Sequence, residues 1–218
     1  MVKSMRIGIP KERNNSETRV GLVPVSIPKL LKLGFEVIIE AGAGEKSGYL
    51  DSVYLEKGAK TATFEEVMDS ELVASIDVPD YKVMKKGQML ACIADPFRNL
   101  EQTKEIIDAG ITLLSLEVIP RRLSKGQSMD VNSSQDNLAG YKAVLLGASH
   151  VPKAIPMMTT SAGTVRPAKV VIMGSGVAGL QAIATAKRLG AVVYASDVRK
   201  SAAEQIESVG GRFIEDDG

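Results

Sequence analysis

A glycine-rich turn, Gly174-Ser175-Gly176-Val177-Ala178-Gly179, lies between the apolar run Val170–Met173 and a stretch with helical apolar spacing. This spacing of three glycines is typical of a turn that brings the backbone N–H groups of a helix N-terminus close to a diphosphate. The next apolar run, 191–195, leads to Asp197. A carboxylate about 20 residues past the turn can accept hydrogen bonds from both hydroxyls of a ribose. These features together predict a dinucleotide-binding site.

The predicted cofactor is NAD(H), because a carboxylate at Asp197 would repel the 2′-phosphate of NADP(H). Gly174 is expected to allow the tight turn and Gly179 the close packing of the helix on the strand, while Gly176 lets the backbone approach the pyrophosphate. Val198, next to Asp197, is assigned to the same site. The alternative is a glycine-rich strand-to-helix turn that binds nothing.

Apolar runs alternate with helical patterns along the whole chain, which predicts a mainly parallel α/β fold. A helix–Gly–strand unit occurs twice, at 30–40 and 187–197, and indicates two doubly wound, Rossmann-like domains. In the first half, the expected strands are Met5–Ile9, Phe35–Glu40, Leu72–Ile76, Met89–Ala94 and a long apolar strand, Ile111–Ile119.

We expect an N-terminal Rossmann-like α/β domain at 1–132, a linker helix at 133–150, and the first half of an NAD(H)-binding Rossmann domain at 151–218. A complete dinucleotide fold has about six strands. After the linker helix only three are expected: Val170–Met173, Ala191–Ala195 and Arg212–Ile214. The second domain is therefore expected to be incomplete, as a truncation or one piece of a split subunit, and the isolated chain not to be fully active.

Composition excludes several classes of protein. The formal net charge is +1, which gives no indication of nucleic-acid binding. The single cysteine, Cys92, excludes an internal disulfide. No apolar run approaches the roughly 20 residues of a membrane span, and no metal site is predicted.

A polar segment, 120–144, joins the two halves and reads PRRLSKGQSMDVNSSQDNLAGYKAV. A helix is expected to open at Ser133-Ser134. Polar side chains between the domains of an α/β enzyme can orient a ligand, but a solvated linker with a capped helix explains the same composition. For Asp130 and Ser133 the alternative role is capping of that helix.

The segment GQSMDVNSSQDNLAGYKAV resembles the signature of the NAD(H)-binding component of proton-translocating nicotinamide nucleotide transhydrogenase. The stretch PMMTTSAGTVRPAKVVIMGSGVAGLQAIATAKRLGAVVYASDVR and the opening RIGIPKE…ETRVGLVP resemble the same family, which shares its fold with alanine dehydrogenase. The resemblance implies three groups of site residues: Arg122, Gln127, Asp130 and Ser133 around the nicotinamide, Val177 and Ala178 at the pyrophosphate, and Asp197 at the adenosine ribose.

The resemblance also implies an activity and partners. Hydride would pass directly between NAD(H) on this chain and NADP(H) bound by a partner component, coupled to proton translocation by a membrane component. Such transfer needs no acid or base, only two nicotinamide rings held roughly 3–3.5 Å apart. A homodimer is expected, cytoplasmic and peripheral on the inner face of the membrane through its partner subunit, without direct insertion.

Two other functions stay open. Alanine dehydrogenases use a lysine and a histidine of the first domain, but the matching stretches here, LVASIDVP and QMLACIAD, contain neither, and the only histidine, His150, lies in a different segment. A non-catalytic NAD-binding module would need the adenosine site but not the polar cluster from Arg122 to Ser133.

Overall fold

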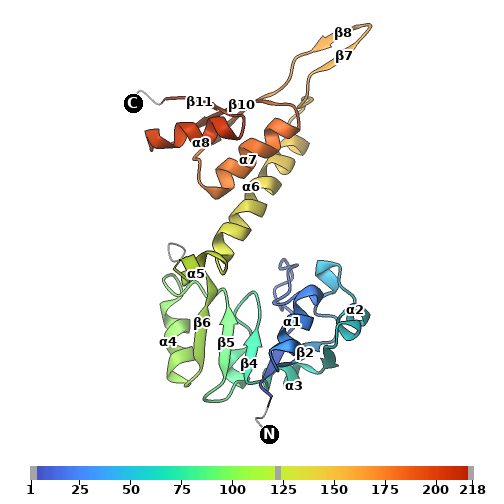
Figure 1. Ribbon diagram of the computed structural model, residues 1–218, viewed down its shortest axis with the longest axis vertical. Helices are drawn as coiled ribbons and strands as arrows, with labels where there is room; N and C mark the ends of the chain where they lie inside the picture. Colours follow the sequence, from blue (N-terminus) through green and yellow to red (C-terminus); the bar gives the residue numbers. More distant parts are fainter. Residues whose placement is uncertain (1–3, 121–123, 216–218) are drawn as a thin grey trace. The chain divides into compact units, whose positions relative to one another are not determined.

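The computed structural model describes residues 4–120 and 124–215 (Figure 1). The chain forms two compact units, Met1–Met129 and Asp130–Gly218, and each is considered by itself. Within the described ranges, no helix combines the length and hydropathy that crossing a membrane requires.

The first unit is built on a parallel sheet of six strands in the order β3-β2-β1-β4-β5-β6. This is the doubly wound order, in which the chain reverses direction across the sheet between β1 and β4. The strands are β1 (Arg6–Ile9), β2 (Glu36–Glu40), β3 (Lys60–Ala62), β4 (Leu72–Ala74), β5 (Met89–Cys92) and β6 (Thr112–Ser115).

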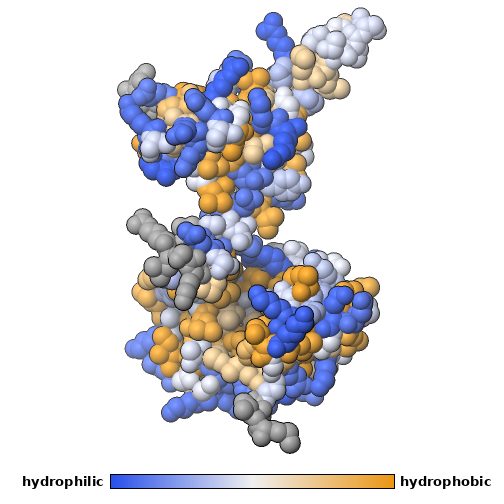
Figure 2. All heavy atoms as spheres, viewed as in Figure 1, coloured by the Kyte–Doolittle hydropathy of each residue, from blue (hydrophilic) through white to orange (hydrophobic). Residues whose placement is uncertain are grey.

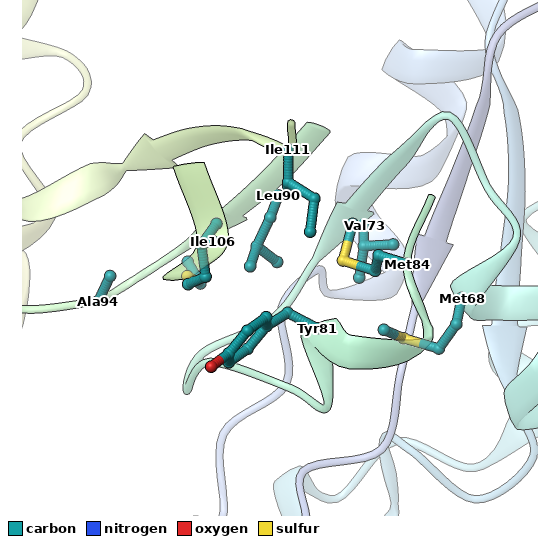
Figure 3. Packing of buried hydrophobic residues seen from close by; sticks show 9 residues of the cluster. Met68, Val73, Tyr81, Met84, Leu90, Ala94, Ile106 and Ile111 are labelled. Carbon is teal, nitrogen blue, oxygen red and sulfur yellow. The ribbon is translucent and has the colours of Figure 1, made fainter. Parts of the chain in front are cut away.

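Five helices accompany this sheet: α1 (Ile27–Lys32), α2 (Asp51–Glu56), α3 (Phe64–Met68), α4 (Leu100–Asp108) and α5 (Ser124–Gln127). Helix α3 begins with a capping box, in which the Thr63 hydroxyl accepts from the backbone of Glu66 and the Glu66 carboxylate accepts from that of Thr63. One buried cluster surrounds Tyr54. In a second cluster, Figure 3 shows apolar side chains gathering from β4, β5, α4 and the segment at Tyr81.

A carboxylate occupies the point where the strand order of the first unit reverses. Glu12 follows β1, and its two carboxylate oxygens accept from the backbone N–H groups of Ile76 (2.6 Å) and Asp77 (3.2 Å), just past β4. Open α/β sheets bind ligands in the crevice outside the carboxyl ends of such strands. In this unit the chain's own side chain spans the two strand ends.

The long strand expected over Ile111–Ile119 is wrong. Strand β6 ends at Ser115 and continues into a 3-10 helix, Leu116–Val118. The cause is its neighbour: β5 ends at Cys92, which pairs with Ser115, so the later apolar residues have no strand to bond with. Strand β3 was not predicted, because it is short and largely polar.

The second unit contains a parallel three-stranded sheet in the order β11-β10-β9. The strands are β9 (Lys169–Met173), β10 (Val192–Ser196) and β11 (Arg212–Phe213), and an antiparallel hairpin joins β7 (Met158–Thr160) to β8 (Gly163–Val165). The helices are α6 (Val131–His150), α7 (Val177–Arg188) and α8 (Ala203–Ser208). Within the described ranges, β9 has a strand neighbour on one side only.

Helix α6 packs along α7 and so forms part of the second unit (Figure 1). The contact is closest at Gly140, where a Cβ atom would lie 2.0 Å from the carbonyl oxygen of Ala178. The helix opens two residues earlier than expected from Ser133-Ser134, because Asp130 is the N-cap. Gly140 therefore lets α6 lie against the first turn of α7.

Candidate dinucleotide-binding site

The turn after β9 needs its three glycines for different reasons. Gly174 has φ +93°, which disfavours any residue with a Cβ. At Gly179 a Cβ would lie 1.9 Å from the carbonyl oxygen of Gly174. Gly176 has an ordinary φ of −70°, and a Cβ there would meet no heavy atom within 4 Å. The fold itself requires glycine at the first and last positions, whereas the space beside Gly176 is open to an external group.

Helix α7 presents its N-terminus to that open space. Gly176 is the N-cap and has no side chain to cap the helix, and the first turn holds no acidic residue. The first backbone N–H groups of a helix have no partner within the helix, and the helix dipole is positive there. Val177 and Ala178 begin α7, so their N–H groups suit an anionic ligand.

Asp197 follows β10 and is tied to the glycine-rich turn. Its Oδ2 accepts from the backbone N–H (2.8 Å) and the hydroxyl (2.6 Å) of Ser175, which is only 1% exposed. Arg199 binds the same carboxylate through its backbone N–H (2.9 Å), Nε (3.0 Å) and a terminal guanidinium nitrogen (3.1 Å). The Arg199 guanidinium first, and then Ser175, hold the pKa of the Asp197 carboxyl well below its usual range.

Val198 has no such role in positioning, because its side chain is fully exposed. It stands between two residues that are fixed by the contact of Asp197 with Arg199. Its assignment to the cofactor site therefore depends on a ligand reaching the surface beside Asp197.

The residues assigned to the nicotinamide lie in different regions of the structure. Arg122 is outside the described residues. Gln127 ends α5 in the first unit and is exposed. Asp130 and Ser133 lie in the second unit, where Asp130 accepts from the backbone N–H (2.9 Å) and the hydroxyl (2.6 Å) of Ser133. Asp130 thus caps α6, and Ser133 is a residue of its first turn.

The Asp130–Ser133 pair is connected to the glycine-rich turn through α6. Ser133 lies roughly 10 Å before Gly140 along the helix, at 1.5 Å per residue. Gly140 in turn touches Ala178, at the start of α7. The pair and the turn are therefore held on one rigid pair of helices, about two turns of α6 apart.

Three residues of this region were not predicted from the sequence. Ser175 is a variable position of the glycine motif, and its hydroxyl type was the only signal. Arg199 lies two residues beyond Asp197, where a guanidinium fork can return to the carboxylate. Gly140 interrupts an otherwise ordinary helical pattern, which signals a close packing contact.

A separate cavity of about 620 Å³ lies within the second unit. Apolar residues of α6, α7 and β9 line it, among them Val144, Ala182 and Ile172, and none of the predicted site residues does. Among the described residues there is also no group of three acidic, histidine or cysteine side chains arranged for a metal ion. The glycine-rich turn with Asp197 therefore remains the candidate site.

Comparison with known proteins agrees with this geometry. The pattern of the alanine dehydrogenase/PNT N-terminal domain matches residues 8–139, and that of the C-terminal domain matches residues 143–216. The chain belongs to the alanine dehydrogenase/PNT family. The second pattern covers the glycine-rich turn, β10 and Asp197.

Relatives within this family fall into two groups. The first portion of the divided NAD(P) transhydrogenase subunit alpha of Rhodospirillum rubrum is 45% identical over 220 residues, covering 96% of this chain and 57% of that protein. Alanine dehydrogenase of Bacillus subtilis is 30% identical over 217 residues, covering 96% of this chain and 56% of that protein. The chain thus spans little more than half the length of these relatives.

The fold also matches a solved transhydrogenase. The crystal structure of transhydrogenase from Sinorhizobium meliloti superposes with a TM-score of 0.94 at 44% identity, covering 97% of this chain and 62% of that chain. The prediction of an α/β chain with Rossmann-like folds related to transhydrogenase and alanine dehydrogenase is therefore confirmed.

Proposed function

We propose that this chain is the NAD(H)-binding component of an NAD(P) transhydrogenase. Hydride passes directly between NAD(H) on this chain and NADP(H) on a partner component, coupled to proton translocation by a membrane component. The observation that carries the proposal is the open space beside Gly176, at the N-terminus of α7 and next to the turn that holds Asp197. The names of the transhydrogenase relatives support the reaction.

The second unit supplies the groups that bind the adenosine half. The N–H groups of Val177 and Ala178 receive the pyrophosphate, with Gly174, Gly176 and Gly179 shaping the turn. Asp197 accepts from the adenosine ribose, and Ser175 holds the carboxylate in place. This arrangement selects NAD(H), because the ionised carboxylate repels a 2′-phosphate.

The nicotinamide end is assigned to Arg122, Gln127, Asp130 and Ser133. The reduced nicotinamide supplies the hydride, so these residues need only fix the ring angle and exclude water. Asp130 and Ser133 already hold each other through two hydrogen bonds at the start of α6. Such mutual support fits a positioning role, since it fixes both rotamers before a ligand arrives.

The proposed partners are an NADP(H)-binding domain, a membrane proton-channel component and a second copy of this chain. The hairpin of β7 and β8 supports the second copy. Every residue of both strands is exposed, including Met158 and Val165, and Figure 2 shows pale and moderately hydrophobic atoms along it. Exposed apolar side chains on a projecting element are typical of an interface. The membrane association proposed for the complex would occur through the partner subunit.

Two other functions predict different results in the same assays. An alanine dehydrogenase would reduce NAD⁺ with L-alanine. His150 gives no support to this alternative, because it is exposed near the end of α6 and its Nδ1 lies 2.8 Å from the carbonyl oxygen of Leu146. A non-catalytic module would bind NADH without altering nicotinamide fluorescence. The transhydrogenase predicts no alanine oxidation and a changed fluorescence.

The test is a hydride-transfer assay with an NADP(H)-binding transhydrogenase component, beside NADH titration. Gln127→Ala and Arg122→Ala are expected to lower the transfer rate more than NADH affinity, because they orient the ring rather than anchor the dinucleotide. Gln205→Ala is the matched control, since Gln205 is an exposed glutamine of α8. An unchanged transfer rate in both variants would remove these residues from the site.

The assay is run on the 218-residue chain alone and with the remaining segment of an alpha subunit supplied. We expect weak binding through the ADP portion in the first case and restored transfer in the second. Full transfer activity of the chain alone with its NADP(H)-binding partner would contradict the expectation that it supplies only half of the second domain.

A further inference from the structure

The carboxylate of Asp197 is fully engaged before any ligand arrives. It receives hydrogen bonds from the backbone N–H and hydroxyl of Ser175 and from the backbone N–H, Nε and a terminal nitrogen of Arg199. An ionised carboxylate offers about four lone-pair positions. The two hydroxyls of a ribose therefore need positions that the chain already occupies.

Only one of these donors is free to leave. Ser175 is 1% exposed and belongs to the glycine-rich turn, and the backbone N–H of Arg199 is fixed by the chain path. The Asp197 side chain is itself only 6% exposed. The Arg199 side chain is 58% exposed, so its guanidinium can rotate into water and be solvated there.

We propose that Arg199 is a displaceable lock on the ribose-binding carboxylate, and that it sets the selectivity of the site between a 2′-hydroxyl and a 2′-phosphate. The proposal rests on the proposed NAD(H) function. In the free chain the guanidinium fork holds Asp197 in its binding position. When the adenosine ribose enters, the fork is released and the hydroxyls take its place on the carboxylate.

Release of the fork has opposite consequences for the two reduced cofactors. For NADH, Arg199 is a competitor, and its removal frees the carboxylate for the ribose. For NADPH, Arg199 is a nearby positive charge that offsets the repulsion between Asp197 and the 2′-phosphate. Loss of the side chain therefore favours NADH and gives NADPH no corresponding gain.

The experiment measures NADH and NADPH affinity by calorimetry for the 218-residue chain and for Arg199→Ala. NADH is expected to bind about two- to fivefold more tightly to the variant, the range of an exposed ion pair. NADPH is expected to bind no more tightly than to the parent chain. A purely structural role would weaken both ligands, so the opposite responses separate the two explanations.

Lys200→Ala is the matched control, because Lys200 is the next residue, is 83% exposed and pairs with Glu215 rather than Asp197. It removes the same charge, and NADH affinity is expected to stay within about twofold, as for a surface charge. The proposal is overturned by weaker or unchanged NADH binding in Arg199→Ala. Equal tightening of NADPH, or equal tightening in Lys200→Ala, overturns it as well.

Failure of the proposed function gives a different pattern. A parent chain that binds neither NADH nor NADPH contradicts both the function and the lock. A parent chain that binds NADH, with Arg199→Ala behaving as the parent does, contradicts the lock alone.

Discussion

The backbone N–H and the hydroxyl of Ser175 donate to the same carboxylate oxygen of Asp197, at 2.8 and 2.6 Å. This double contact joins the glycine-rich turn after β9 to the end of β10, so the two halves of the dinucleotide motif hold each other. The acid is therefore placed for a ribose by the turn that would bind the pyrophosphate.

Replacing Asp197 with asparagine is expected to weaken NADH binding roughly tenfold or more, because charge-assisted hydrogen bonds to the ribose are lost. NADPH should lose less, since the repulsion of its 2′-phosphate disappears as well. Titration of both cofactors checks this. Equal affinity of the unmodified chain for NADH and NADPH would already contradict the role given to Asp197.

The same carboxylate predicts a flat pH dependence. Arg199 and Ser175 hold its pKa well below the usual range, so the folded chain binds its proton only in strong acid. Its stabilising contribution is present above the unfolded pKa of about 3.9 and is lost as the pH falls through the lower folded value. NADH affinity measured from about pH 5 to 8 should show no titration of this group.

The glycines at 176 and 179 are expected to fail in different ways when replaced by alanine. Gly176→Ala leaves the fold intact, because its Cβ meets no atom of the chain, but it obstructs the pyrophosphate. Gly179→Ala places a Cβ 1.9 Å from the carbonyl oxygen of Gly174 and should lower the free energy of unfolding by about 1–3 kcal/mol. Thermal unfolding and NADH titration of both variants distinguish the two. Loss of stability in Gly176→Ala would show that the space is not open.

Gly140 and Gly147 provide a matched pair within α6. Gly140→Ala should destabilise the second unit by about 1–3 kcal/mol, because its Cβ would lie 2.0 Å from the carbonyl oxygen of Ala178. Gly147→Ala meets no atom and should stabilise the chain by roughly 0.4–1 kcal/mol through the entropy of the unfolded state. Chemical denaturation measures both. Equal effects would mean that α6 does not approach α7 at Gly140.

Glu12 predicts a pH effect of the opposite sign from Asp197. Burial, partly offset by the hydrogen bonds from Ile76 and Asp77, raises the pKa of its carboxyl. An acid with a raised folded pKa contributes stability that is full below the unfolded pKa and is lost as the pH rises through the folded value. Thermal unfolding of the parent chain and Glu12→Gln should therefore differ most at about pH 4. The difference should shrink toward pH 7, and a constant difference would contradict the raised pKa.

The sequence predicted best those features that depend on neighbouring residues. The glycines of the turn, the end of α7 at Gly190 and the capping box at Thr63 depend on local backbone preferences, and the structure shows all of them. The alternation of strand and helix was likewise visible from apolar runs. These signals lie within a few residues of the feature that they specify.

The features that were missed depend on partners distant in sequence. Strand β6 stops where β5 stops, which its own apolar run does not reveal. The hairpin of β7 and β8 is exposed throughout, so it lacks a buried face and the alternation that would announce it. Arg199 could bind solvent or Asp197 equally well on paper, and only the folded position of the carboxylate decides between them.

The bridge that Glu12 makes to Ile76 and Asp77 has a consequence for protein engineering. A nucleotide site grafted onto the six-stranded sheet would have to displace this acidic side chain, since phosphate and the carboxylate would contend for the same N–H groups. Rewriting the loop after β1 with glycines would not suffice. A single side chain thus keeps the first unit from adopting the second unit's ligand.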